Sequence, residues 1–165
     1  MLPSFFTPEL LRELPRIALR AVRLVSAVAG TASAGGYLCI ADNVGHAERI
    51  TLVGSVDQAS WLLCLGTVQM SASGIGPRDE GASMYVYQEE NTAYGAAQRF
   101  DDYVLAFAGF PDPWNKAVVV AIQYGLYIEA GMSRSVAALK AKYSEDFPLL
   151  SILLQVDREM EKAAA

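Results

Sequence analysis

Few residues in this chain of 165 residues have the type and spacing that catalysis or metal binding requires. With one histidine in the sequence, a Ser-His-Asp or Cys-His arrangement would have to use His46, and no glycine-x-serine-x-glycine motif accompanies it. Cys39 and Cys64 lie in separate apolar runs without the paired spacing of a zinc site, so we expect them to be reduced core residues. These residues favour neither a hydrolase nor a metal protein.

Three pairs of adjacent acids, Asp79-Glu80, Glu89-Glu90 and Asp101-Asp102, could offer oxygen atoms to a hard cation. They lack the periodicity of a calcium loop, and acids in turns are usually solvated. Gly74-Ile75-Gly76 follows a predicted helix and lacks the third glycine of a dinucleotide fingerprint. An enzyme with a carboxylate as its base therefore has the least support.

The residues most typical of a binding site are aromatic and gather around the predicted strands. Such rings can line a pocket for a flat ligand, but aromatic residues are also favoured in strands as plain core residues. Both interpretations stay open. The candidate ligand-binding residues are His46, Arg78, Tyr94, Arg99, Tyr103 and Trp114.

The overall charge and composition point to a protein partner and away from nucleic acid. The formal net charge is −5, whereas phosphate contacts need a basic surface. Hydrophobic residues make up 53% of the chain and charged residues 19%, so the polar surface is small for a monomer. This composition predicts a homo-oligomer.

Four arginines share one face of a predicted N-terminal helix, at positions Arg12, Arg16, Arg20 and Arg23. Because Glu9 and Glu13 border them, a solvated face with short-range ion pairs is favoured over a site for an anion or a membrane surface. The arginines also interrupt the apolar segment at this end of the chain, and no uncharged apolar stretch of about 18 residues occurs elsewhere. We therefore expect a cytoplasmic protein without a membrane span.

The predicted elements begin with a helix over residues 7–29, with Thr7 as N-cap, Pro8 in its first turn and Pro15 as a kink or second start. A hairpin over 37–42 and 49–53 follows. Residues 55–58 are expected to cap a middle helix, and residues 71–82 to form an exposed loop.

Three further strands are predicted at 84–88, 94–100 and 103–108, with a tight turn at Asp101-Asp102. The strand 103–108 is apolar at both alternating sets of positions, so it is expected at the centre of the sheet, covered on both faces.

Three C-terminal helices are predicted within 112–162, the first with Asp112 as N-cap and Pro113 as its first residue. The last has an apolar stripe that fits either packing onto the domain or a partner helix, formed by Leu149, Leu153, Val156 and Met160.

Together these elements predict one α+β domain over residues 1–165, with an N-terminal helix (7–29), a sheet with a middle helix (36–110) and C-terminal helices (112–162). The fold is a five-stranded antiparallel sheet flanked by helices, in the order α-β-β-α-β-β-β-α.

Two segments resemble the small haem-binding proteins of the HbpS and GlcG type: Asp42-Asn43-Val44-Gly45 looks like their aspartate-to-glycine turn, and residues 95–109 look like their glycine-rich strand, acidic turn and closing strand. The resemblance implies a profilin-like fold and haem as a possible cofactor, with His46 as a candidate axial ligand. The family's arginine-methionine pair is absent, since Leu52-Val53-Gly54-Ser55 stands in its place.

The leading hypothesis is a self-associating, non-catalytic domain that binds or senses a small planar ligand, such as haem, between the sheet and residues 71–82. The alternative is a structural module for protein interaction that binds no small ligand.

Overall fold

The computed structural model describes residues 1–57, 60–88 and 91–164. In these residues it contains ten helices and strands, in this order: α1 (Pro8–Ala29), β1 (Gly35–Ala41), β2 (Ala47–Gly54), α2 (Trp61–Ser73), β3 (Gly81–Gln88), β4 (Asn91–Phe100), β5 (Tyr103–Ala108), α3 (Trp114–Glu129), α4 (Ser133–Lys142) and α5 (Phe147–Ala164). The predicted α+β architecture is confirmed.

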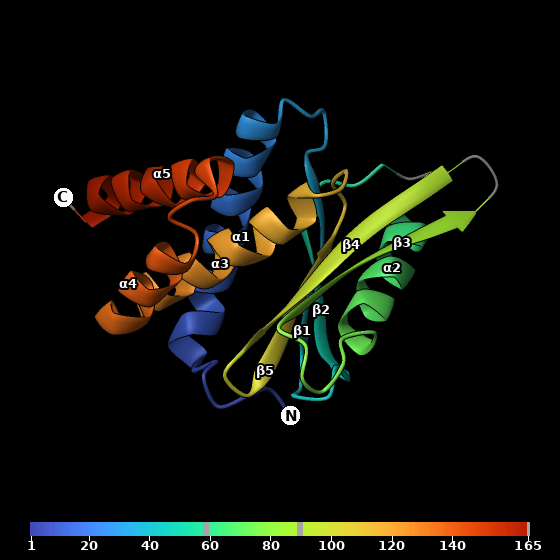
Figure 1. The fold of residues 1–165 in the computed structure, drawn as a ribbon, viewed down its shortest axis with the longest axis horizontal. Helices are drawn as coiled ribbons and strands as arrows, with labels where there is room; N and C mark the ends of the chain where they lie inside the picture. Colours follow the sequence, from blue (N-terminus) through green and yellow to red (C-terminus); the bar gives the residue numbers. More distant parts are fainter. Residues whose placement is uncertain (58–59, 89–90, 165) are drawn as a thin grey trace.

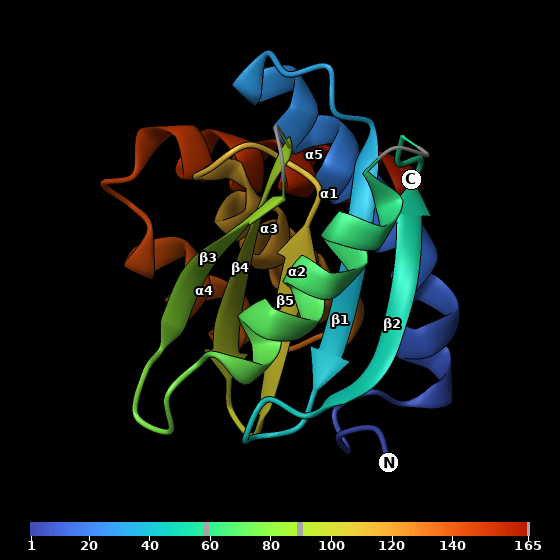
Figure 2. The same ribbon diagram turned by 90° about the vertical axis from the view of Figure 1, so that its right-hand side faces the viewer.

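The strands form one sheet in the order β2-β1-β5-β4-β3, and all neighbouring strands are antiparallel. Helix α2 covers one face, and α1 and α3 cover the other, with α4 and α5 packed outside α3 (Figures 1 and 2). Strand β5 lies at the centre and all its residues are buried, as the sequence predicted.

The side chains of β5 differ in size between its two faces. The large ones enter the core with α1 and α3: Tyr103, Leu105 and Phe107. The small ones face α2: Val104, Ala106 and Ala108. On the neighbouring strand, a Cβ at Gly95 would lie only 2.3 Å from the Ser71 hydroxyl oxygen, so small residues let α2 approach the sheet closely.

Helix α1 begins as predicted, because the Thr7 hydroxyl accepts a hydrogen bond from the Leu10 N–H at 3.2 Å. It continues as one helix through Pro15, so the alternative of a second start is wrong. Pro15 is exposed, and because it has no N–H, the Leu11 carbonyl loses its helical donor.

Several predicted boundaries are corrected. Helix α2 begins at Trp61 with Ser60 as N-cap, not after residues 55–58, of which Gln58 lies outside the described residues. The predicted loop over 71–82 is shorter, because α2 continues to Ser73 and β3 already begins at Gly81. Within α2 the Ser71 hydroxyl donates to the Thr67 carbonyl at 2.8 Å.

Helix α3 begins at Trp114, with Pro113 as N-cap. The prediction of Asp112 as N-cap and Pro113 as the first helical residue is therefore wrong by one position. The Asn115 side chain explains this start, since it bonds both the N–H and the carbonyl of Phe110 at 2.9 and 2.7 Å. These two bonds hold residues 110–115 as a turn before the helix.

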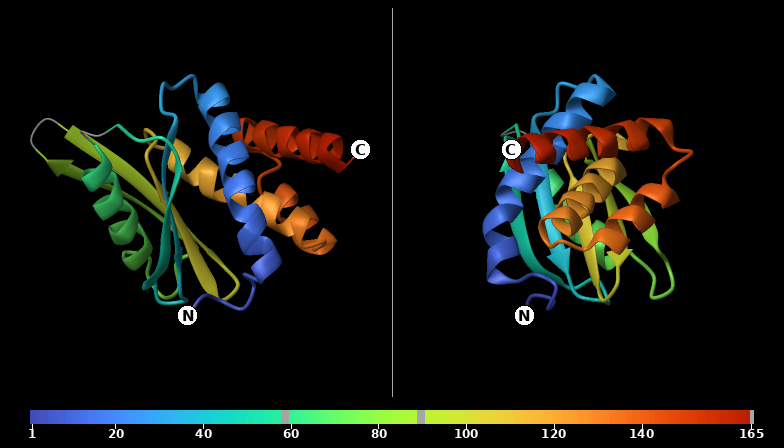
Figure 3. Two further views of the ribbon diagram at one scale, coloured as in Figure 1. Left: turned by 180° about the vertical axis from the view of Figure 1, so that it is seen from behind. Right: turned by 90° about the vertical axis from the view of Figure 1, so that its left-hand side faces the viewer.

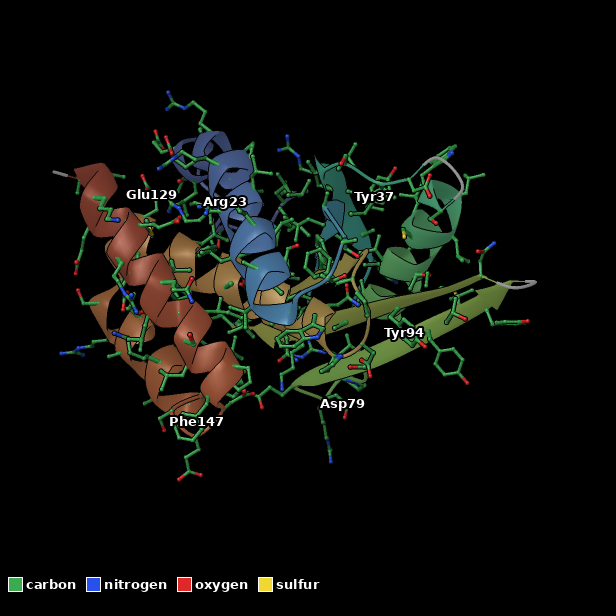
Figure 4. All side chains as sticks on the ribbon, turned by 90° about the horizontal axis from the view of Figure 1, so that it is seen from above. Arg23, Tyr37, Asp79, Tyr94, Glu129 and Phe147 are labelled. Carbon is green, nitrogen blue, oxygen red and sulfur yellow. The ribbon has the colours of Figure 1, made fainter. Side chains whose placement is uncertain are left out.

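The helical layer is joined by apolar packing and by the arginines of α1. Leu149, Leu153 and Val156 of α5 are buried in the main core, which confirms the packing interpretation of that stripe. Arg12 and Arg16 are exposed and pair with Glu9 and Glu13, which confirms the predicted solvated face with short-range ion pairs. In addition, Arg20 and Arg23 pair with Glu159 of α5, at 3.4 and 2.5 Å, so this face also joins α1 to α5, which lie side by side (Figure 3). Figure 4 labels Arg23 on α1.

Because Phe107 is fully buried, we expect Phe107→Ala to lower the free energy of unfolding by about 3–5 kcal/mol, through lost burial and the cavity it leaves. Leu154→Ala on the exposed side of α5 is the control and should change stability by less than about 1 kcal/mol. Urea unfolding followed by circular dichroism measures both, and equal losses would contradict this placement of the core.

Candidate functional site

The six predicted ligand-binding residues do not converge on one pocket. Tyr94, Tyr103 and Trp114 lie on the side of the sheet covered by α1 and α3. Arg99 and His46 lie toward the loops at one end of the opposite face, and Arg78 is exposed in the loop between α2 and β3. The sheet separates the two groups.

Tyr103 is a core residue. Its side chain is fully buried, and its hydroxyl donates to the Gln123 Oε1 at 2.7 Å. Phe5 stacks on its ring and Phe6 meets it edge-on, with centroids 5.4 and 5.1 Å away. Burial raises the pKa of Tyr103, which keeps the phenol neutral. Its contacts therefore stabilise the fold.

Arg99 joins two loops. Its guanidinium donates to the backbone and side-chain oxygens of Asn43, to the Gly76 carbonyl at 2.9 Å and to the Asp79 carbonyl at 3.2 Å. These bonds connect the β1–β2 turn with the loop that precedes β3. The planar, five-donor group suits such a brace better than a lysine would.

His46 lies in the turn between β1 and β2 with its ring exposed. The Asp42 Oδ1 accepts the N–H groups of His46 and Val44 at 2.8 and 3.0 Å, and these bonds lower the pKa of Asp42. The His46 Nδ1 is 3.5 Å from the Asp42 Oδ2. The backbone of His46 thus holds the turn, and its role as a haem ligand stays a prediction.

The other chemical groups are isolated. Within residues 1–57, 60–88 and 91–164, no three histidine, cysteine or acidic side chains gather closely enough to hold a metal ion, and Glu89-Glu90 lie outside these ranges. Both cysteines are free and buried. Burial raises the pKa of Cys39 to about 12 and also raises that of Cys64, so neither is a ready nucleophile.

The structure also exposes an apolar surface, made of residues that have no catalytic or metal-binding chemistry. It comprises the outer edge of β3 and the neighbouring outer face of α2, and we call it the α2–β3 surface. Neither element contains a charged residue. Its exposed members on α2 include Leu62, Gln69 and Met70. The exposed side chains of β3 project from the other face of the sheet, on the α3 side, and the two groups meet only at the β3 edge: Ser83, Tyr85 and Tyr87.

The backbone of β3 leaves one set of hydrogen-bonding groups unpaired with β4. The Arg99 N–H bonds the Glu80 carbonyl at 2.7 Å, and the register pairs Gly81 with Gln98. Since bonded and non-bonded pairs alternate in an antiparallel ladder, Ser83, Tyr85 and Tyr87 direct their N–H and C=O groups away from the sheet. Among the described strands none pairs with this edge.

Comparisons with other proteins do not assign a function. Neither the family models nor the curated proteins compared with this sequence give a match. No helix within the described ranges is both long and apolar enough to cross a membrane. The sequence shows that residues 61–73 and 81–88 contain no charged residue, which was the one signal for the α2–β3 surface. The sequence does not show that these two elements are neighbours, because that depends on the fold of the sheet.

We expect Arg99→Ala to lower the free energy of unfolding by about 1–3 kcal/mol, because several carbonyl oxygens lose a charged donor. Arg99→Lys should recover only part of this loss, since one ammonium cannot span the same acceptors. Arg78→Ala is the matched control, with less than about 0.5 kcal/mol expected. Thermal unfolding measures all three, and a neutral Arg99→Ala would contradict the bracing role.

Proposed function

We propose that this protein is a non-catalytic interaction module that self-associates through the α2–β3 surface. The observation that supports this most strongly is the edge strand itself. Strand β3 has eight residues, and none is charged or proline. Soluble proteins usually protect a sheet edge with such residues, because an unprotected edge pairs with another strand.

The side chains around this edge favour association as well. Tyr85 and Tyr87 expose about two thirds of their surface, and Leu62 on α2 exposes 65%. Apolar side chains of this size gain most from leaving water, and tyrosine is common at the centre of interfaces. Gly66 of α2 has open space around it, which lets a partner approach the helix backbone.

A second copy of the chain is the occupant that fits these features. Antiparallel pairing of β3 with the β3 of another copy places the same surface on both sides of a two-fold axis. With a net charge of −5, two copies repel each other wherever their acidic surfaces meet. Within α2 and β3 no charged residue opposes such contact. The composition, which predicted an oligomer, agrees.

We expect the wild-type protein to dimerise in a concentration-dependent manner. Tyr85→Glu and Met70→Glu place like charges opposite each other across the axis, so each should raise the dimer dissociation constant by at least about tenfold. Sedimentation equilibrium over a range of concentrations measures this.

Phe147→Glu is the matched control, because Phe147 is equally exposed but lies at the start of α5. Its dissociation constant should equal that of the wild type. A wild-type protein that stays monomeric throughout would refute the proposal. If only Phe147→Glu loses the dimer, the interface lies on the C-terminal helices and not on the α2–β3 surface.

A second candidate function is binding of a planar ligand on the tyrosines of β3 and β4. The rings of Tyr85 and Tyr94 lie 6.2 Å apart at 46°, on the side of the sheet facing α3. Such rings can stack on a flat molecule. The resemblance to haem-binding proteins of profilin-like fold supports haem as that molecule.

Titration with haemin, followed by visible absorption, tests this second candidate. We expect a saturable Soret shift that weakens in Tyr94→Ala, because the ring that stacks on the ligand is gone. Tyr37→Ala, a ring on the opposite face of the sheet, is the control. If His46→Ala leaves the spectrum unchanged, His46 is not the axial ligand. If the wild-type protein gives no saturable Soret shift, haem is not the ligand.

A further inference from the structure

A groove lies at the opposite edge of the sheet, between α1 and β2. Its volume is about 350 Å³. Figure 2 shows α1 behind β2 and reaching past this edge strand, so the helix forms one wall and the strand the other. We call it the α1–β2 groove, lined among others by Leu11, Pro15, Leu19, Arg49, Thr51 and Val53.

The backbone beside this groove has unpaired hydrogen-bonding groups. The Ser55 N–H bonds the Ala34 carbonyl at 3.3 Å, and the register pairs Gly35 with Gly54. By the alternation of an antiparallel ladder, Arg49, Thr51 and Val53 bond to β1, whereas Ile50 and Leu52 direct their N–H and C=O groups outward. No other strand of the described residues pairs with β2 on this side.

A positive charge lies in the wall of the groove. Arg49 is exposed, and no ion pair or side-chain hydrogen bond joins it to another described residue. The adjacent acid, Glu48, is already occupied, because the α-amino group of Met1 lies 2.6 Å from its Oε2. The groove therefore combines apolar walls, a free strand edge and an unpaired guanidinium.

We propose that the α1–β2 groove binds an extended peptide segment that adds an antiparallel strand to β2. Alternate apolar side chains of the peptide enter the groove opposite Val53 and Thr51, and a carboxylate two residues further on pairs with Arg49. Main-chain bonds to Ile50 and Leu52 supply sequence-independent affinity, and the groove selects the side chains. The sequence recognised is apolar-x-apolar-x-acidic.

This occupant follows from the shape and charge of the edge. Because α1 reaches past β2 on one face, the space beside the strand suits a single extended chain better than the sheet of another folded copy (Figures 2 and 3). The unpaired Arg49 favours an acidic peptide. The inference does not rest on self-association, since it uses the other edge of the sheet.

A displayed library of seven-residue peptides with all positions randomised tests the recognition rule. Selection on the intact protein should enrich the apolar-x-apolar-x-acidic pattern. Synthetic copies of enriched peptides should bind, and N-methylation of the peptide nitrogens that face β2 should weaken binding by at least about tenfold, because it removes main-chain donors. No enrichment, or enrichment of helical or basic sequences, would overturn the proposal.

Variants and amide exchange locate the binding. Arg49→Glu and Leu19→Glu should each raise the dissociation constant of an enriched peptide by at least about tenfold. Arg158→Glu, an exposed arginine of α5, is the control and should change nothing. Bound peptide should slow the amide exchange of Ile50 and Leu52 but leave that of Thr51 unchanged. If all variants bind the peptide equally, or if the peptide slows amide exchange outside β2, the peptide does not bind in the α1–β2 groove.

Discussion

The structure depends on one constraint, which is that β5 must be covered on both faces. All six of its side chains are buried, so it needs a helix layer on each side and a paired strand at each edge. Strands β1 and β4 supply the pairs, α2 supplies one cover, and α1 with α3 supplies the other. Placing β5 at the centre leaves β2 and β3 as the two margins of the sheet.

The two margins differ in charge and in the helix that lies beside them, and this difference underlies both functional proposals. The β3 margin is uncharged, with exposed rings on one face of the sheet and the uncharged helix α2 on the other, which suits a surface that meets a copy of itself. The β2 margin carries Glu48 and Arg49 and lies under α1. Charge at that edge opposes nonspecific pairing, while the groove admits a chain of matching pattern.

The sequence was sufficient for the sheet and the central strand, because turn residues and the pattern of apolar residues, which in 103–108 occupies both alternating sets of positions, report local geometry directly. It was insufficient for the site. Tyr103 and Arg99 have the types of ligand-binding residues, yet one is enclosed by Phe5 and Phe6 and the other braces two loops. Which face a side chain joins depends on register, and which loops meet depends on strand order. Neither quantity is local in the sequence.

The most direct measurement is the distance between two copies of the chain at the β3 margin. Because Cys39 and Cys64 are buried, a spin label on Ser83→Cys reports that margin selectively. Electron–electron dipolar spectroscopy should give a narrow distribution below about 30 Å, since paired strands lie about 5 Å apart and the two labels are offset by only a few residues. A longer or absent distance, in a protein that is dimeric by sedimentation, would contradict pairing through β3.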